Sequence, residues 1–315
     1  MTSPYSVDPD ITRASTLPGA FYRDPRAYEL ARERVFARSW QWLGDTDDVA
    51  QPGSLSPRAL LPGCLDEPLL VSRDAHGVLR CLSNVCTHRG NLLVKTPCRA
   101  EQIRCGYHSR RFDMAGRMTF MPEFDGARDF PAPSDHLPNV AFGVFGTQAF
   151  AAVDPVAPLQ AFLGDIQARL AWMPIAQFRH DPSRNRSFDI AAHWALYVEN
   201  YLEGLHIPFI HPGLMKTLDI DRYSYELHPY ANLQLAIARD DEAAFELPPS
   251  SPDHGQRIAA YYYWIFPNLM LNFYPWGLSV NLVQPLAMAR TRVRFRSFVR
   301  FGSLLGQGAC GALDE

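Results

Sequence analysis

The chain has 315 residues, of which 47% are hydrophobic and 20% charged, which suffices for two modest globular domains and is unlike the composition of a disordered protein. Its net charge of −3 argues against nucleic acid or an anionic membrane as a general partner. Residues 1–11 lack the basic start and apolar core of a signal peptide, and the longest apolar stretch, residues 140–153, is too short to cross a membrane, so we expect a cytoplasmic protein.

Three parts follow one another along the chain. Residues 25–42 have the apolar spacing of a helix, with Tyr28, Val35 and Phe36 on one face. Residues 49–153 are rich in Gly and Pro, with short apolar runs between turn signals, which predicts a small all-β domain. Residues 158–172 return to helical spacing, and strands surround one further helix after residue 184. We therefore predict a helical segment over 1–42, an all-β domain over 43–155 and a second domain over 156–315.

Two Cys–His couples lie about one hairpin's length apart in the all-β part. One residue separates Cys86 from His88, and two separate Cys105 from His108. Two thiolates and two imidazoles are the ligand set of a Rieske 2Fe–2S cluster, in which the histidines raise the reduction potential. The alternative is a structural zinc site, whose paired ligands usually stand about two to four residues apart in each knuckle. The single residue between Cys86 and His88 favours the cluster.

A second candidate metal site lies near residue 200. Glu203 and His206 are three residues apart and would share one face of a helix that begins near His193. His206 and His211 are five apart, but Pro208 cannot continue the helical hydrogen bonding, so a bend or widened turn could bring both imidazoles together before Pro212 ends the segment. Two histidines and one carboxylate, with open positions, form the facial triad of non-haem Fe(II) oxygenases.

Both motifs resemble those of the alpha subunits of Rieske non-haem iron oxygenases. The Rieske motif is matched by Cys86-Thr87-His88-Arg89-Gly90 and Cys105-Gly106-Tyr107-His108-Ser109, and the iron motif by residues 200–211. The resemblance implies that the two cysteines bind one iron of the cluster and His88 with His108 the other, while His206 and His211 bind a mononuclear Fe(II). It departs from the family at Arg110, where many relatives carry Trp.

Glu203 and Asn200 are expected to serve the reaction beside this iron. Asn200 stands at the motif's Asn. Glu203 stands where the family usually has Asp, the residue that links the Rieske histidine of one subunit to the mononuclear iron of its neighbour. Glu at this position resembles the branch that acts on quaternary ammonium compounds, including the carnitine and choline monooxygenases.

The resemblance also implies a fold and a reaction. The fold is α+β, with an all-β Rieske domain and a catalytic domain in which an antiparallel sheet grips helices, the helix-grip or START-like arrangement. The protein would be a terminal oxygenase component that uses O2 as co-substrate and receives electrons from NAD(P)H through a reductase or ferredoxin. It would hydroxylate or oxidatively demethylate a small quaternary ammonium or aromatic compound, and would assemble as a homotrimer.

The third iron ligand has no match in the chain. In the family it is an Asp or Glu on a C-terminal helix, whereas here residues 302–311 are Gly-rich and only Asp314 and Glu315 are late carboxylates. As terminal residues after such a stretch, they are not expected to coordinate. We expect the catalytic domain to lack its C-terminal helix, the third ligand to lie beyond Glu315, and an apolar face of the sheet to be left uncovered.

The substrate pocket is expected to come from two aromatic runs, residues 261–266 and 271–276. Aromatic faces can hold a quaternary ammonium group by cation–π attraction, and Tyr274 and Trp276 are the best candidates for such a cage because Pro275 and Gly277 predict a kinked rim. The alternative is that these aromatic side chains only fill the core.

Three other functions stay open at this point. A Rieske electron-transfer or regulatory subunit would lack the mononuclear iron. A ring-dihydroxylating dioxygenase would act on arenes. A zinc-stabilised binding module would hold no cluster. Metal content separates them, because an oxygenase binds about three irons per chain, an electron carrier two, and a zinc module none.

Overall fold

The computed structural model describes residues 5–310, which form two compact units. The unit called here the β unit comprises Ala37–His180, and the α+β unit combines the residues up to Phe36 with those from Asp181 onward. The N-terminal helical segment therefore belongs to the same unit as the C-terminal half of the chain. No described helix has the length and apolar character that crossing a membrane requires.

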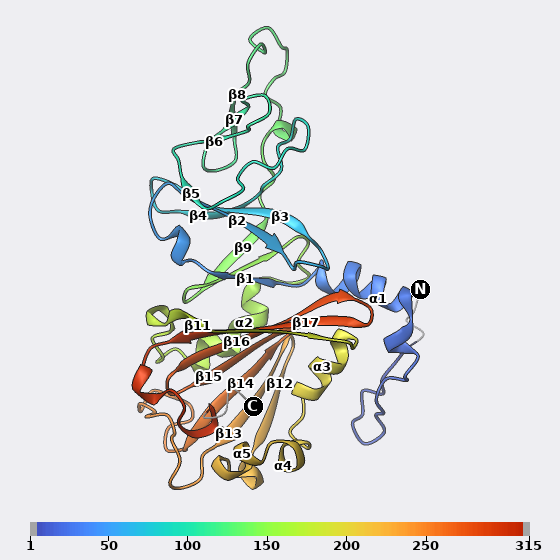
Figure 1. Ribbon diagram of the computed structural model, residues 1–315, viewed down its shortest axis with the longest axis vertical. Coiled ribbons are helices and arrows are strands. Elements are labelled where there is room, and N and C mark those ends of the chain that lie inside the picture. Colours follow the sequence, from blue (N-terminus) through green and yellow to red (C-terminus); the bar gives the residue numbers. More distant parts are fainter. Residues whose placement is uncertain (1–4, 311–315) are drawn as a thin grey trace. The chain divides into compact units, whose positions relative to one another are not determined.

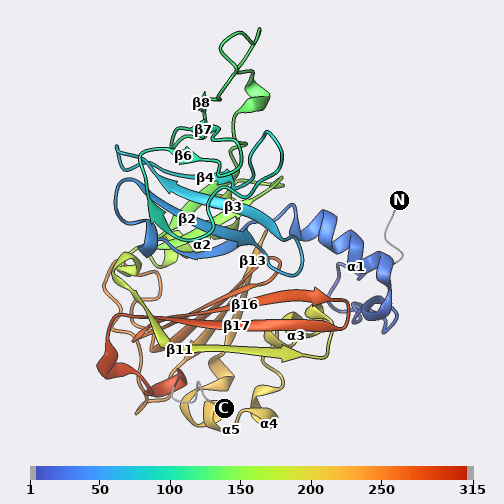
Figure 2. The ribbon, with the colours of Figure 1, turned by 45° about the horizontal axis from the view of Figure 1, so that its top comes forward.

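The β unit contains three small antiparallel sheets and one helix (Figures 1 and 2). The sheets have the strand orders β1-β10-β9, β4-β3-β2-β5 and β6-β7-β8. The strands are β1 Gln41–Asp45, β2 Ser54–Leu60, β3 Glu67–Arg73, β4 Leu79–Ser83, β5 Cys98–Arg99, β6 Ile103–Arg104, β7 Arg111–Phe112, β8 Met118–Phe120, β9 Ala141–Phe145 and β10 Gln148–Ala152. Helix α2, Leu159–Arg169, forms as predicted and buries Phe162, Leu163 and Ile166.

The expected helix over residues 25–42 is wrong in its C-terminal part. Helix α1, Pro25–Ala31, continues as a π-helical turn, Arg32–Phe36, and stops there. Trp42 instead lies in β1, paired with Phe150 of β10, and its indole nitrogen donates to Gln148 Oε1 at 2.9 Å. The apolar residues up to Trp42 keep the spacing of a helix, but strand pairing determines the conformation at the end of this segment.

The α+β unit is built on a seven-stranded antiparallel sheet with the order β11-β17-β16-β15-β14-β13-β12. Its strands are β11 Arg179–Ile190, β12 Ser224–His228, β13 Ala231–Ile237, β14 Ile258–Ile265, β15 Leu269–Tyr274, β16 Gly277–Ala287 and β17 Arg290–Val299. The helices between β11 and β12 are α3 Trp194–Tyr201, α4 Ile207–Ile210 and α5 Pro212–Thr217, and α3 packs against β16. A unit built mainly of strands, together with an antiparallel sheet with helices, confirms the predicted α+β fold class.

The expected uncovered sheet face is not found in four inner strands of the described sheet, although the edge strands β11 and β12 expose Phe188 and Leu227. Almost every residue of β13, β14, β15 and β16 is buried, on both faces of the sheet. After β17 the chain forms two 3-10 turns, Gly302–Leu304 and Gly308–Cys310. Leu304, Leu305 and Ala309 pack against a buried cluster that includes Tyr262 and Tyr274. The Gly-rich segment therefore covers apolar surface without forming a helix; Asp314 and Glu315 lie outside the described residues.

Two candidate metal sites

Two loops of the β unit have the same backbone design. The amide of Cys86 donates to the carbonyl of Asn91 at 2.9 Å, and the amide of Cys105 donates to the carbonyl of Arg110 at 2.8 Å. The carbonyl of each cysteine accepts from the residue four positions later, Gly90 at 3.0 Å and Ser109 at 3.1 Å. Both of these residues have positive φ, 69° for Gly90 and 60° for Ser109. Each loop is thus a closed turn that fixes a cysteine and the histidine that follows it.

The loops bring the four predicted cluster residues together. Cys86 and Cys105 are each 2% exposed and belong to one apolar cluster, and each thiol influences the pKa of the other. The imidazole rings of His88 and His108 lie 4.8 Å apart between centroids. Among the described residues, no three of these four side chains have ligand atoms within 4.8 Å of one another. The four donors therefore do not surround one ion, as a zinc site would require, and instead form a sulfur pair and a nitrogen pair.

The surroundings of these donors fit a 2Fe–2S cluster. The buried Nδ1 atom of His108 has no hydrogen-bond partner among the described residues, which is costly unless a metal takes its lone pair. The amide of Tyr107 and the side-chain nitrogen of Asn91 approach the sulfur of Cys105 at 3.5 and 3.6 Å, as donors to a thiolate do. Burial, with the nearby His108 and Arg110 charges, lowers the pKa of His88, so its ring stays neutral, as a metal ligand must be.

The second candidate site differs from the expected helix. Helix α3 ends at Tyr201, so Glu203 and His206 do not share a helical face. Gly204 allows the break: its amide donates to the Tyr225 hydroxyl at 2.9 Å, and a Cβ at this position would lie only 2.6 Å from that oxygen. The Glu203 carboxylate instead accepts from the backbone amides of Leu205 and His206, and its Oε1 lies 2.5 Å from His206 Nδ1. The loop, and not a helix, makes this contact.

His206 and His211 lie close together, with ring centroids 5.2 Å apart. The single turn of α4 separates them, and the amide of His211 donates to the carbonyl of Ile207 at 3.0 Å. Pro208 lies in the first turn of α4, and Pro212 begins α5. Helix α4 therefore ends just before Pro212, as expected, but Pro212 also begins a new helix, because proline is well suited to the first turn, where no intrahelical amide bond is lost.

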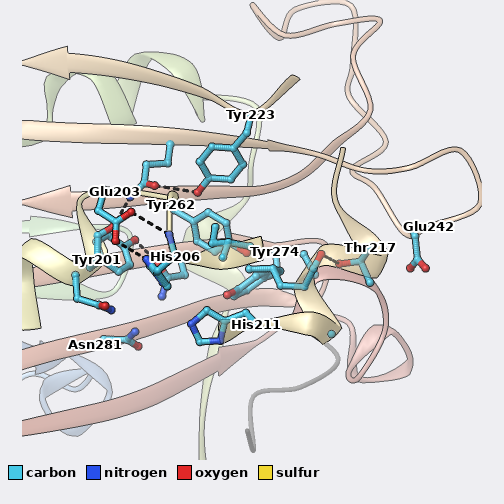
Figure 3. Close-up of a pocket in the computed structure, with 18 of the residues that line it drawn as sticks. Tyr201, Glu203, His206, His211, Thr217, Tyr223, Glu242, Tyr262, Tyr274 and Asn281 are labelled. Carbon is cyan, nitrogen blue, oxygen red and sulfur yellow. Dashed lines mark hydrogen bonds and ion pairs between the residues drawn. The ribbon is translucent and has the colours of Figure 1, made fainter. Parts of the chain in front are cut away.

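A cavity of about 730 Å³ opens beside this pair of histidines (Figure 3). Asn200, Glu203, His206 and His211 line it, and Glu242 lies at the end opposite Glu203. No lysine or arginine is among its described lining residues. In the part of the chain that the structure describes, no carboxylate forms a metal-binding group with His206 and His211, so the third iron ligand is not found there.

Five tyrosines supply the aromatic lining: Tyr197, Tyr201, Tyr223, Tyr262 and Tyr274. The hydroxyl of Tyr201 donates to Asn272 Oδ1 at 2.5 Å, and that of Tyr223 to Gln234 Oε1 at 2.9 Å. Burial raises the pKa of Tyr197 to about 12 and that of Tyr201 and Tyr223 well above the ordinary value. These phenols are therefore neutral.

Of the two residues predicted to form an aromatic cage, only Tyr274 reaches the cavity. Tyr274 lines the cavity, but Trp276 is fully buried and does not. Tyr274 stacks on the indole at 5.4 Å, and the Arg184 guanidinium lies 5.9 Å from the indole centroid. The sequence reasoning missed Tyr197 and Tyr201, although both stand beside Asn200 on α3 with helical spacing. It had no signal for Tyr223, which a distant turn contributes.

Comparisons with known proteins match both parts of the chain. The family of Rieske [2Fe-2S] domains matches residues 39–131, and that of ring hydroxylating alpha subunits (catalytic domain) matches residues 172–304. The carnitine monooxygenase oxygenase subunit of Escherichia coli (strain K12) is 28% identical over 266 residues, which are 83% of this chain and 68% of that protein. The chloroplastic choline monooxygenase of Arabidopsis thaliana is 28% identical over 310 residues, 93% of this chain and 70% of that protein.

Solved structures show the same fold. The quaternary ammonium Rieske monooxygenase CntA in complex with L-carnitine has a TM-score of 0.72 at 22% identity, covering 91% of this chain and 76% of that one. Naphthalene 1,2-dioxygenase from Rhodococcus sp. has a TM-score of 0.70 at 20% identity, covering 90% and 73%. The predicted family is confirmed. The chain belongs to the alpha subunits of Rieske non-haem iron oxygenases, enzymes that use a 2Fe–2S cluster, a mononuclear iron and O2, and that receive electrons from a reductase or ferredoxin.

Proposed function

We propose that this chain is the terminal oxygenase component that hydroxylates or oxidatively demethylates a small quaternary ammonium compound. The observation that carries this proposal is the character of the cavity beside His206 and His211. Tyrosine rings and two carboxylates line it, and no lysine or arginine is among its described lining residues.

A quaternary ammonium group has no N–H to donate, so it needs negative potential and aromatic faces more than hydrogen-bond acceptors. The hydroxyls of Tyr201 and Tyr223 are occupied by protein acceptors, which leaves their rings as the surface offered to a ligand. Glu203 and Glu242 contribute negative charge at the two ends of the cavity. The relatives named carnitine and choline monooxygenases support the same substrate class.

We propose that Cys86 and Cys105 hold one iron of the cluster and that His88 and His108 hold the other. His206 and His211 would hold the mononuclear iron, with a carboxylate from outside the described residues as the third ligand. When bound, the cluster supplies electrons one at a time and the mononuclear iron activates O2. Substrate binding and orientation depend on the side chains that line the cavity. The tyrosines bind and orient the substrate, and Asn200 lines the cavity beside the substrate.

Glu203 acts as a positioning residue in this proposal. Its carboxylate accepts from His206 Nδ1, which fixes the tautomer of the ring and leaves Nε2 free for a metal. The motif resemblance suggests that this carboxylate also links the iron to the Rieske histidine of a neighbouring subunit, and a solved relative is described with inter-subunit electron transfer.

A homotrimer is proposed as the assembly that allows such a contact. Leu205, Phe209 and Ile210 follow Glu203 directly and are 79%, 84% and 65% exposed. Large apolar side chains exposed together suggest a surface that another chain covers. An NAD(P)H-dependent reductase or a ferredoxin would supply the electrons, and the cytoplasmic location stays a prediction.

The test is a single turnover without a partner protein. Protein reduced with dithionite is exposed once to O2 in the presence of choline, carnitine, betaine or a panel of aromatic acids, and products are identified by mass spectrometry. Hydroxylated or demethylated product from an ammonium compound, and none from the arenes, is expected. Dihydroxylated arene as the only product would contradict the proposed substrate class and identify a ring dioxygenase.

The second candidate is an electron-transfer or regulatory subunit. The observation that favours it is the lack, among residues 5–310, of a carboxylate grouped with His206 and His211. A protein that binds two irons per chain, undergoes reversible reduction and gives no product would support this function.

A further inference from the structure

Arg110 is a buried cation next to the proposed cluster site. Its side chain is only 3% exposed, although arginine is among the residues least often found inside proteins. One guanidinium nitrogen donates to the Thr87 hydroxyl at 2.8 Å, and another donates to Asp135 Oδ1 at 2.9 Å. Burial of a charge is costly, so these contacts are needed to hold it there.

Arg110 joins the two loops that carry the four candidate ligands. Thr87 stands between Cys86 and His88, whereas Arg110 itself follows the second couple, and its carbonyl accepts from the Cys105 amide at 2.8 Å. The Thr87 hydroxyl in turn donates to the Asp135 carbonyl at 2.7 Å. One side chain thus ties both loops to each other and to the 3-10 turn Pro133–Asp135.

The charge of Arg110 is only partly balanced by Asp135. The carboxylate is 21% exposed, so water screens it more than the guanidinium. The second carboxylate oxygen of Asp135 accepts a hydrogen bond from the Ala132 amide at 2.9 Å. The Nε of Arg110 has no partner among the described residues, and the Phe130 ring, 5.6 Å away, is a weak additional contact. A net positive field should therefore act on both loops.

We propose that Arg110 is a positioning residue that locks the two cluster loops together, and that its buried charge raises the reduction potential of the cluster while Asp135 lowers it. The inference rests on the proposed cluster site. One-electron reduction makes the cluster one charge more negative, and a fixed cation nearby stabilises that reduced state. A nearby carboxylate has the opposite effect.

The experiment compares midpoint potentials of Arg110→Gln, Asp135→Asn and the double variant in the cluster-loaded protein. The potentials are measured by dithionite titration with redox mediators and read by circular dichroism in the visible range. Arg110→Gln should shift the potential down, Asp135→Asn should shift it up, and the double variant should lie between them. Arg104→Gln is the matched control, since the Arg104 side chain is exposed and, among the described residues, donates a hydrogen bond only to the Ser109 hydroxyl on the same loop, at 2.9 Å.

A purely structural role would move both single variants in the same direction or leave the potentials unchanged, and either result overturns the inference. If Arg110→Gln does not retain a cluster, Asp135→Asn alone still tests the proposed electrostatic effect. An unchanged or lowered reduction potential in Asp135→Asn would contradict it. Arg110→Lys keeps the positive charge but cannot donate to both Thr87 and Asp135. This variant should therefore retain less cluster, while its reduction potential stays nearly unchanged. A lack of any cluster in the unaltered protein would instead contradict the proposed cluster site itself.

Discussion

The Oε1 atom of Glu203 lies 2.5 Å from the Nδ1 atom of His206, on the wall of the cavity. Partial burial alone would raise the pKa of Glu203, but its hydrogen bonds to the His206 side chain and to the Leu205 and His206 amides lower it overall. The carboxylate is therefore charged at neutral pH and holds a proton on Nδ1. A histidine held in this way presents Nε2 as a metal ligand.

Glu203→Gln should leave both metals bound and slow electron transfer between them. The amide keeps the size of the side chain but loses the charge that orients His206, and losses of outer-shell partners of this kind cost roughly tenfold or more. The measurement is stopped-flow reoxidation of the reduced cluster by O2, with iron counted in parallel. Glu242→Gln is the control, since this carboxylate lines the opposite end of the same cavity. Equal reoxidation rates in the unaltered protein and in Glu203→Gln would remove the positioning role.

Cys86→Ala and Cys105→Ala should each abolish the visible spectrum of the cluster and leave iron bound at His206 and His211. A thiolate ligand cannot be replaced by a methyl group, and the mononuclear site lies in the other unit. The matched control is Cys81→Ala, because Cys81 is equally buried, and burial raises the pKa of its thiol to about 12. Retention of the spectrum in either loop variant would refute the ligand assignment.

Tyr274→Leu should weaken choline binding by about threefold to thirtyfold, which is the equivalent of one cation–π contact. Tyr274→Phe keeps the ring and should bind nearly as well. The same comparison is made by calorimetry with the uncharged choline analogue in which carbon replaces nitrogen. If the leucine variant loses both ligands equally, the ring contributes only apolar contact and the cation-binding role is wrong.

Choline should bind more tightly than carnitine to the unaltered protein. Both carry the trimethylammonium group, but carnitine also carries a carboxylate, and no described lining residue is a lysine or arginine that could neutralise it. An unpaired carboxylate in a partly desolvated cavity is unfavourable. Competitive binding assays check this order, and a clear preference for carnitine would contradict it.

Stability should fall as the pH drops from about 6.5 towards 4, partly because of His193. This residue is 3% exposed, lies among the rings of Phe21, Tyr22, Tyr28 and Trp194, and accepts the Ala195 amide at the start of α3. Burial lowers its pKa to about 4, so the unfolded chain takes up a proton at higher pH than the folded one does. The loss reaches on the order of 3 kcal/mol below pH 4, because each pKa unit corresponds to about 1.4 kcal/mol.

Thermal unfolding from pH 7 to pH 4.5 checks this dependence on His193. His193→Asn, which can still cap the helix but does not titrate in this range, should flatten the pH dependence by a few degrees. His76→Asn, at an exposed position, should keep it. If the melting temperature of His193→Asn falls with pH as steeply as that of the unaltered protein, other groups cause the loss of stability.

Local motifs predicted most of the cluster site, because each Cys–His couple lies on one short loop. The contact between Glu203 and His206 was also expected, but from a helical face that does not exist, since Gly204 and Tyr225 end the helix before it. Trp276 was misassigned because an aromatic run in a strand does not reveal which of its side chains are buried. Tyr223 reaches the cavity from a distant turn, and the register of the sheet determines that Tyr262 is the residue of the run 261–266 that lines it.

Metal analysis of protein produced with iron and sulfide available is the decisive test of whether one chain holds two different iron sites. We expect about three irons and two acid-labile sulfides per chain, with the visible absorption of a Rieske cluster, and loss of about one iron in a His206→Ala, His211→Ala double variant. Two irons per chain, unchanged in that variant, would contradict the mononuclear site. A colourless protein that holds zinc would contradict the whole account.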